Sequence, residues 1–242
     1  MATPPIHYGT RAKLGFMIPS LNVAVEGQLP AMCPEGVSLH FTRLKLNSSK
    51  KEDMERMADN LEDAASMLAD AGMDVITFHC TGVTTLAPDM DERLINRITK
   101  ATGRKATATG RALGEGLKLF DAKKIVLLTP YPQFVNDNEI AFLKAKGVEV
   151  IKDVALGVAD ASGMFDITPE DWIRLGIENR NDEADAYFIS CAAVRSAEAI
   201  DTLEAALGKP VITSNQVSFW HALRMAGIKD PVQGFGRLLS VH

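Results

Sequence analysis

Hydrophobic positions along the chain follow two alternating patterns. Short, continuous apolar runs of strand length are separated by longer segments in which apolar residues recur every three or four positions. Continuous runs are typical of strands covered on both faces, as in a parallel sheet, because a strand with one solvated face would alternate apolar and polar residues. The runs predict strands at residues 14–18, 37–44, 75–79, 105–107, 125–129, 148–154, 186–190 and 211–213.

The segments between these runs carry helical periodicity. Between residues 47 and 72, for example, Met54, Met57 and Leu61 recur at helical spacing, and Gly72 provides a stop. Strands that alternate with helices predict an α/β fold with mostly parallel sheets. Further helices are predicted at residues 89–101, 110–120, 133–146, 169–180, 195–207 and 215–226.

Two pairs of landmarks repeat at the same interval. The first predicted strand ends at Pro19 in "MIPSLN" and the fifth ends at Pro130 in "LLTPYP", so the interval is 130 − 19 = 111 residues. Cys80 and Cys191 follow the third and seventh strands, and 191 − 80 is also 111. The shared interval predicts a duplication in which two halves, related by a pseudo-twofold axis, each contain a four-stranded, mostly parallel sheet flanked by helices.

The duplication divides the chain into α/β halves at residues 14–121 and 122–228, and the tail at 229–242 is expected to pack back on the N-terminal half. In parallel α/β sheets, ligands bind beyond the carboxyl ends of the strands, where helix N-termini point. Both Cys80 and Cys191 lie at such ends. We therefore expect an active site between the halves, with one thiol on each side of a bound ligand.

Two opposed thiols could act on carbon in two ways. A thiolate and a thiol could remove a proton from one face and return it on the other, or a thiolate could add to an activated double bond and leave after bond rotation. A helix N-terminus is expected to lower the pKa of such a thiol below its ordinary value of about 8.5. Both reactions develop negative charge, which needs preorganised donors. Candidate donors are the backbone N–H groups of "CTG" and "CAA" and the side chains of Ser20, Asn22, Thr81, Tyr131, Ser214 and Asn215.

Composition and charge bear on other functions. The chain has 46% apolar and 24% charged residues, which is ordinary for a globular protein with a sizeable core. Its formal net charge of −5 gives no basic surface for nucleic acid. The longest apolar run, at residues 125–128, is far too short to span a membrane. The N-terminus lacks the charged and apolar regions of a signal peptide, so the cytoplasm is the expected location.

The remaining cysteine and histidine pattern does not indicate a metal or cofactor. Three cysteines are an odd number, which favours free thiols, and Cys33 has no counterpart in the other half. There is no CxxC or HxxxH motif, and His79 and Cys80 would point to opposite faces of a strand. Walker and GxGxxG motifs are also missing, so we expect no metal and no nucleotide cofactor.

Several stretches together resemble one known family. They are "GFMIPSLNVAVEGQLPAM", "HCTG", "TPYPQFVN" and "SCAAVRSAEAIDTLEAALGKPVITSNQ". Over residues 12–238 the chain resembles the aspartate/glutamate racemase superfamily, specifically its branch of maleate cis-trans isomerases and arylmalonate decarboxylases. The stretches "SFWHALRMAGI" and "GFGRLL" look more like the decarboxylases.

The resemblance implies roles for individual residues. Cys80 matches the isomerases' nucleophilic or proton-abstracting thiol, where the decarboxylases carry glycine, and Cys191 matches the proton-donating thiol shared by both groups. Asn22 matches a carboxylate-binding asparagine, Tyr131 a substrate-binding tyrosine and Thr81 a dioxyanion-hole hydroxyl. The expected substrate-binding residues are Pro19, Ser20, Asn22, Thr81, Gly82, Tyr131, Ala192, Ala193 and Asn215.

Two departures from the isomerases leave the substrate open. Isomerases often follow the first cysteine with an apolar run, whereas this chain has Thr81-Gly82-Val83, and its "TSNQ" stretch is not their small-residue run. The leading hypothesis is a cofactor-independent isomerase or racemase of a small carboxylate or dicarboxylate. The alternatives are an arylmalonate-type decarboxylase that uses Cys191 as proton donor, and a non-catalytic binding protein for small carboxylates. Oligomeric state stays open, with a homo-oligomer as one option.

Overall fold

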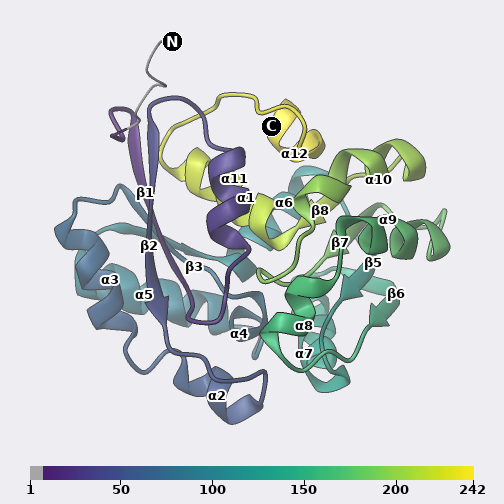
Figure 1. Ribbon diagram of the computed structural model, residues 1–242, viewed down its shortest axis with the longest axis horizontal. Helices are drawn as coiled ribbons and strands as arrows, with labels where there is room; N and C mark the ends of the chain where they lie inside the picture. The colour runs from purple at the N-terminus through teal and green to yellow at the C-terminus, as the bar shows by residue number, and fades with distance from the viewer. Residues whose placement is uncertain (1–7) are drawn as a thin grey trace.

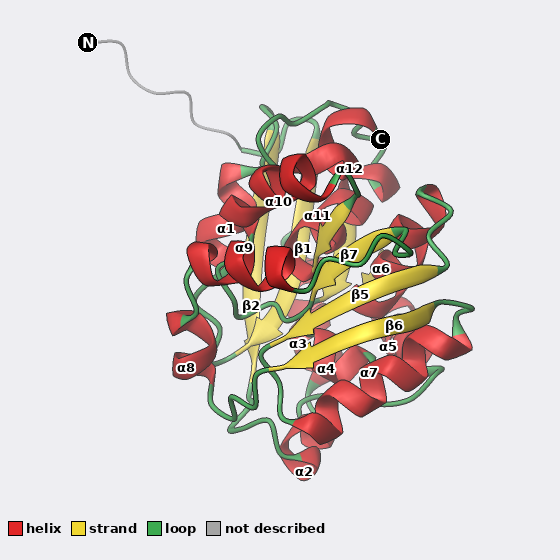
Figure 2. Cartoon of the chain, turned by 90° about the vertical axis from the view of Figure 1, so that its right-hand side faces the viewer, coloured by secondary structure: helices red, strands yellow, loops and turns green. Residues whose placement is uncertain are grey.

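The computed structural model describes residues 8–242 and arranges them around two four-stranded sheets. All pairings between neighbouring strands are parallel. The first sheet comprises β1 (Ala12–Pro19), β2 (Val37–Leu44), β3 (Val75–Phe78) and β4 (Lys105–Ala108), and the second comprises β5 (Lys124–Thr129), β6 (Glu149–Ala155), β7 (Ala186–Ile189) and β8 (Val211–Thr213). Figure 2 shows helices on the outer faces of both sheets. The predicted α/β fold is confirmed.

Helices lie between consecutive strands and, as α11 and α12, after the last strand (Figure 1). They are α1 (Val25–Ala31), α2 (Lys51–Arg56), α3 (Leu61–Asp70), α4 (Thr81–Thr84), α5 (Met90–Thr102), α6 (Thr109–Leu119), α7 (Gln133–Ala145), α8 (Ala161–Asp166), α9 (Pro169–Glu178), α10 (Ile200–Leu207), α11 (Ser214–Met225) and α12 (Gly236–Val241), with a short 3-10 helix, η1 (Ala197–Ala199), before α10. The sequence pattern did not predict α1, α4, α8 or α12, because helices of four to seven residues are too short to show a period. Among residues 8–242, no helix is long and apolar enough to cross a membrane.

The two sheets have the same strand order. It is β2-β1-β3-β4 in the first sheet and β6-β5-β7-β8 in the second. Leu14 of β1 pairs with Val75 of β3, and Ile125 of β5 pairs with Ala186 of β7. Both partners are therefore displaced by 111 residues, since 125 − 14 and 186 − 75 are each 111. The repeat in the sequence is thus also a repeat of register.

An aspartate before the central strand repeats in the same way. The Asp74 carboxylate accepts a hydrogen bond of 2.8 Å from the Lys13 backbone N–H, and Asp185 accepts one of 2.8 Å from the Lys124 backbone N–H. Both carboxylates thereby bind the start of the neighbouring strand. The intervals are again 185 − 74 = 111 and 124 − 13 = 111.

The last quarter of each half departs from this interval. Lys105 starts β4 and Val211 starts β8, so this interval is 211 − 105 = 106 residues. The connection between the third and fourth strand is therefore five residues shorter in the C-terminal half. This shortening explains why the fourth strands align only loosely in the sequence.

The two halves share their hydrophobic cores. One buried cluster includes Met17 and Phe78 from the first half together with Tyr187 and Leu203 from the second, and a second cluster is similarly mixed. Helix α11 follows β8 in the chain, yet it packs on α6, β3 and β4 of the N-terminal half. Folding of either half is therefore expected to depend on the other.

The C-terminal tail contacts both halves, whereas the sequence predicts packing on the N-terminal half. Helix α12 contacts α10, α11 and β8, all of which come from the C-terminal half. Contact with the N-terminal half comes from an ion pair between Asp230 and Arg11 and from the His242 ring against Phe120. Leu238 and Leu239 of α12 are buried in a core cluster that contains residues of both halves, such as Leu117 and Ile212.

Candidate active site

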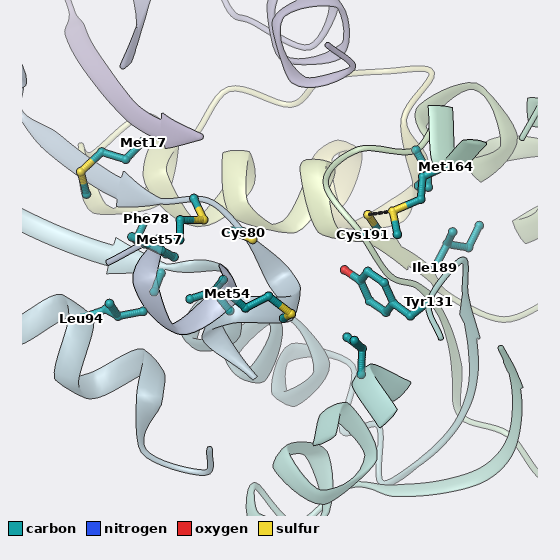
Figure 3. Close-up of a cluster of buried hydrophobic side chains, with 14 of the residues drawn as sticks. Met17, Met54, Met57, Phe78, Cys80, Leu94, Tyr131, Met164, Ile189 and Cys191 are labelled. Carbon is teal, nitrogen blue, oxygen red and sulfur yellow. Dashed lines mark hydrogen bonds between the residues drawn. The ribbon is translucent and has the colours of Figure 1, made fainter. Parts of the chain in front are cut away.

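One cavity lies where strand ends of the two sheets converge. Pro19 ends β1, while Cys80, Tyr131 and Cys191 each lie two residues beyond β3, β5 and β7. Both cysteines line this cavity, one from each half. In Figure 3 the Tyr131 hydroxyl points toward the space between them. The cavity is lined by Pro19, Leu21, Asn22, Leu46, Ser48, Ser49, Met54, Cys80, Thr81, Gly82, Tyr131, Val135, Ala161, Met164, Cys191, Ala192 and Ala193.

Cys80 immediately precedes a helix. Its backbone is extended, with φ −152°, and it forms the N-cap of α4. The backbone N–H of Val83, in the first turn of α4, lowers the pKa of the Cys80 thiol and so opposes part of the effect of burial. The side chain is buried, with 8% of the residue exposed. Cys80 therefore has a defined orientation and one backbone donor that could stabilise a thiolate.

Cys191 lies in a strained turn rather than at a helix start. Its φ is +93°, a region that residues with a Cβ rarely adopt. Its backbone N–H donates to Ser214 Oγ at 3.0 Å, and the Ala193 N–H donates to its sulfur at 3.3 Å. The Met164 sulfur lies 3.8 Å from the Cys191 sulfur (Figure 3). The turn thus aims the thiol into the cavity at a cost in backbone strain.

The expectation that the thiol pKa values are lowered is wrong. Burial raises the pKa of Cys80 to about 12, although the Val83 N–H opposes the shift. Burial likewise raises the pKa of Cys191 to about 11, opposed by the Ala193 N–H and by a hydrogen bond with Tyr131. Helix α4 has four residues and η1 starts only at Ala197, so neither thiol has a long helix behind it to offset desolvation.

Asn22 presents an unpaired donor. Its Oδ1 accepts hydrogen bonds from the backbone N–H groups of Ala24 (2.9 Å) and Val25 (3.1 Å), which fixes the amide. The Nδ2 group is buried without a hydrogen-bond partner, although the residue lines the cavity. An unsatisfied buried donor is costly unless a ligand can pair with it. Asn22 therefore suits an oxygen atom of a bound ligand.

Thr81, Gly82 and Tyr131 surround the first cysteine. A Cβ placed on Gly82 would lie 3.8 Å from the Tyr131 hydroxyl oxygen and only 2.9 Å from the Met54 Cε atom. Glycine therefore keeps the cavity open between α2 and Tyr131. Thr81 Oγ1 is hydrogen-bonded to Ser214 Oγ at 2.8 Å.

Two of the predicted substrate-binding residues do not line the cavity. The Ser20 hydroxyl pairs with the backbone of Leu46. Asn215 is fully buried behind the cysteine turns and bonds His79, Gln28 and the Ala192 carbonyl oxygen. The structure brings together the other predicted residues, Pro19, Asn22, Thr81, Gly82, Tyr131, Ala192 and Ala193, with both cysteines.

The sequence did not identify the apolar walls. They are formed by Leu21, Leu46, Met54, Val135, Ala161 and Met164. Met54 had been assigned to a helical core stripe, and it is indeed buried there while its end reaches the cavity. Ser48 and Ser49 are two further lining residues that sequence reasoning missed, since serines between a strand and a helix carry no specific signal. Among residues 8–242, no charged side chain lines the cavity.

His79 is part of the scaffold and not of a metal site. Its ring bonds Thr109 Oγ1 at 2.9 Å and Asn215 Oδ1 at 2.8 Å, and burial lowers its pKa to about 4. The ring is therefore neutral near pH 7. No group of three or more His, Cys, Asp or Glu side chains suited to a metal ion occurs within the described part of the chain.

Known proteins that are similar to this chain include maleate isomerases and an arylmalonate decarboxylase. The maleate isomerase of Nocardia farcinica is 29% identical over 238 residues, covering 94% of this chain and 95% of the isomerase. The solved structure of a Nocardia farcinica maleate cis-trans isomerase mutant with a covalently bound succinylcysteine intermediate has a TM-score of 0.90 and 26% identity, and covers 96% of this chain and 99% of that chain. The arylmalonate decarboxylase of Bordetella bronchiseptica is 26% identical over 201 residues, covering 81% of this chain and 84% of the enzyme.

The family assignment covers nearly the whole chain. The model of the family described as arylmalonate decarboxylase matches residues 14–239, a span that contains both sheets and every residue that lines the cavity. The protein therefore belongs to the arylmalonate decarboxylase family.

Proposed function

We propose that the protein is a cofactor-independent isomerase of a small unsaturated carboxylate, with Cys80 as nucleophile and Cys191 as proton donor. The observation that carries this proposal is that two free thiols from equivalent positions of a duplicated fold line one cavity. A single thiol would suffice for one-sided protonation, whereas two allow attack on one side and proton transfer on the other. The similarity to maleate isomerases makes maleate the first substrate to test.

The addition route accounts for every atom. Cys80 gives its proton to a carboxylate of the bound substrate, and its thiolate forms a C–S bond with one alkene carbon. The π electrons move to the neighbouring carbon, which takes the proton of the Cys191 thiol. The carbon–carbon bond is now single and rotates. Cys191 then takes a proton back from that carbon, the C–S electrons return to the Cys80 sulfur, Cys80 recovers its proton from the carboxylate, and the trans alkene leaves.

A covalent intermediate favours this route over direct proton exchange. The Nocardia farcinica isomerase mutant holds a succinylcysteine, which is the adduct expected when a thiol adds to a four-carbon unsaturated diacid. In this chain, the Ala193 N–H donates to the Cys191 sulfur, and the Val83 N–H lowers the pKa of Cys80, so each would favour a thiolate at one of the two positions. Because burial raises both thiol pKa values, we expect ionisation of Cys80 to be coupled to the arrival of substrate.

Neutral groups would bind the carboxylate. Asn22 offers its unpaired Nδ2, and Tyr131 and Ser49 line the same cavity. Ser48 and Thr81 line it too, but their hydroxyls donate to Asp53 and Ser214, respectively. Hydrogen bonds from fixed donors are strong where water is excluded, and they strengthen as charge moves onto the carboxylate during addition. We propose Pro19, Gly82, Ala192 and Ala193 as the small or rigid residues that let the substrate approach the two turns.

Decarboxylation is the second candidate. The family assignment and the apolar walls favour it, because Leu46, Met54, Val135 and Met164 could contact an apolar substituent. In that reaction a malonate-type acid would lose CO₂, and Cys191 would protonate the remaining carbanion. Cys80 would have no required part.

The test compares two reactions in four variants. We expect wild type to convert maleate to fumarate, and Cys80→Ser and Cys191→Ser each to lose this activity, because a serine hydroxyl is a far weaker nucleophile and acid. Cys33→Ser is the matched control, since Cys33 lies outside the cavity. Fumarate is followed by NMR. Near wild-type turnover in Cys80→Ser or Cys191→Ser would refute the two-thiol assignment. If wild type shows no isomerisation and releases CO₂ from an arylmalonate at a rate that Cys80→Gly leaves unchanged, the decarboxylase is favoured.

We also propose a reducing location such as the cytoplasm. Cys33, Cys80 and Cys191 are all free, and thiols are kept reduced there. The division into halves at residues 14–121 and 122–228 stays a prediction. Formation of a homo-oligomer is also a prediction, which size-exclusion chromatography with light scattering would test.

A further inference from the structure

We propose that Ser214 and Asn215, the first two residues of α11, are positioning residues that hold the two cysteine turns at a fixed separation. The proposal rests on the proposed function, in which Cys80 and Cys191 act on one substrate from opposite sides. Neither side chain lines the cavity, and both are fully buried behind it. Their effect on the reaction would therefore pass through the residues that flank the thiols.

Asn215 connects the residue before one cysteine with the residue after the other. Its Oδ1 accepts from the His79 ring at 2.8 Å, and His79 precedes Cys80. Its Nδ2 donates to the Ala192 carbonyl oxygen at 3.2 Å, and Ala192 follows Cys191. The second hydrogen of Nδ2 goes to Gln28 Oε1 at 3.0 Å. Every donor of this amide is thus used, and the amide orientation is determined by its partners.

Two neighbours fix this connection from behind. Asn215 Oδ1 can only accept, so the His79 ring carries its proton on Nε2, and its Nδ1 accepts from the Thr109 hydroxyl at 2.9 Å. Gln28 Nε2 donates to the Val194 carbonyl oxygen at 2.7 Å, three residues beyond Cys191. The chain of hydrogen bonds therefore runs without interruption from β3 to the turn after β7.

Ser214 makes the complementary connection. Its Oγ accepts from the Cys191 backbone N–H at 3.0 Å and is hydrogen-bonded to Thr81 Oγ1 at 2.8 Å. Thr81 follows Cys80, so Ser214 bridges the far side of the first turn to the second cysteine itself. The two bridges cross the same gap from adjacent residues of one helix. Rotation of either turn relative to the other would break at least one of them.

The start of α11 is a rigid base for these bridges. Thr213 and Gln216 form a reciprocal capping box, in which the Thr213 side chain accepts from the Gln216 N–H and the Gln216 side chain accepts from the Thr213 N–H. The helix is buried through most of its length and packs on α6, β3 and β4 of the other half. Because α11 belongs to one half and packs on the other, it can hold the two cysteine turns at a fixed separation.

The chemistry requires such a fixed distance. Reacting atoms must approach to about 3–3.5 Å on both sides of the substrate, and a misplacement of about 1 Å can cost about 100-fold in rate. Cys191 also keeps φ +93°, a conformation that persists only when its surroundings hold it. The Ser214 hydrogen bond to its N–H is one such restraint.

The experiment compares Asn215→Ala with Asn136→Ala. Both substitutions remove a fully buried, hydrogen-bonded asparagine amide, but Asn136 lies on α7, bonds Thr129 and Asp153, and does not line the cavity. We expect Asn215→Ala to lower kcat for maleate about 10- to 100-fold with KM changed less than about threefold, and Asn136→Ala to keep kcat near wild type. The second measurement is the ratio of carboxymethylation at Cys80 and Cys191 by iodoacetate, read by peptide mass spectrometry. We expect that ratio to change in Asn215→Ala only.

Each outcome decides the proposal. An unchanged labelling ratio in Asn215→Ala, or a kcat equal to that of Asn136→Ala, would overturn it. If Asn215→Ala does not fold, Ser214→Ala takes its place under the same criteria. If wild type does not turn over maleate, the proposed function fails by itself, and the labelling ratio alone then decides whether Ser214 and Asn215 position the thiols.

Discussion

Glu139 provides a test of how the interior treats a carboxyl group close to the site. It lies on α7 and is fully buried. Its Oε1 accepts from Ser190 Oγ at 2.8 Å, next to Cys191, while Oε2 has no hydrogen-bond partner. Burial raises its pKa to about 8, against the opposing effect of the Ser190 hydrogen bond. The carboxyl is therefore neutral in the folded protein near pH 7.

The sign of the pH dependence follows from proton binding. The folded state keeps this proton up to a pH of about 8, whereas an unfolded chain releases it near its ordinary pKa of 4.5. Stability from this group is fully present below pH 4.5 and is lost as the pH rises to about 8. At about 1.4 kcal/mol per pKa unit, wild type loses about 2 kcal/mol between pH 5 and pH 7 through this carboxyl.

Glu139→Gln removes this loss. Glutamine keeps the carbonyl oxygen that accepts from Ser190 and does not ionise. The duplication supplies a precedent, because 139 − 111 = 28 and the equivalent residue of the first half is Gln28. We expect the variant to gain about 2 kcal/mol over wild type between pH 5 and pH 7. Urea unfolding followed by the fluorescence of Trp172 and Trp220 measures this.

The control for this experiment is Glu52→Gln, the same substitution at an exposed position of α2. The informative quantity is the difference in unfolding free energy between Glu139→Gln and wild type at each pH. A difference that is equal at pH 5 and pH 7 would refute the argument, because it would mean that Glu139 is already ionised in the folded protein at pH 5.

Three further predictions concern other buried groups. Burial lowers the pKa of His79 from 6.5 to about 4, so stability should fall as the pH drops from 6.5 to 4, by up to about 3 kcal/mol, and His79→Gln should flatten this part of the urea-unfolding profile. Because φ of Cys191 is +93°, Cys191→Gly should be more stable than Cys191→Ala by about 1 kcal/mol in urea unfolding, the reverse of the usual order; equal stability would argue against strain. Asn22→Asp keeps the acceptor for Ala24 and Val25 but loses the free donor, so KM for the carboxylate substrate should rise about tenfold or more, and an unchanged KM would remove Asn22 from the binding site.

The sequence alone determined the architecture and the principal residues of the candidate site. Continuous apolar runs of strand length are typical of strands covered on both faces, so each run predicted a strand of a parallel sheet. The equal intervals from Pro19 to Pro130 and from Cys80 to Cys191 predicted the duplication, because a repeated strand order forces equivalent residues to equivalent strand ends. The cysteines, Asn22 and Tyr131 then had to approach the same edge.

Tertiary structure decided which side chains reach the cavity and which support it. Asn215 is polar, and the sequence suggests that it binds substrate, yet its side chain bonds the Ala192 carbonyl oxygen and does not line the cavity. Met54 is apolar, and the sequence suggests a core position, yet its side chain also lines the cavity. Whether a side chain faces a ligand depends on helix rotation and on packing across the two halves, neither of which a local pattern encodes. The thiol pKa values depended on the same packing, since desolvation by residues distant in the chain outweighs the nearby backbone N–H groups.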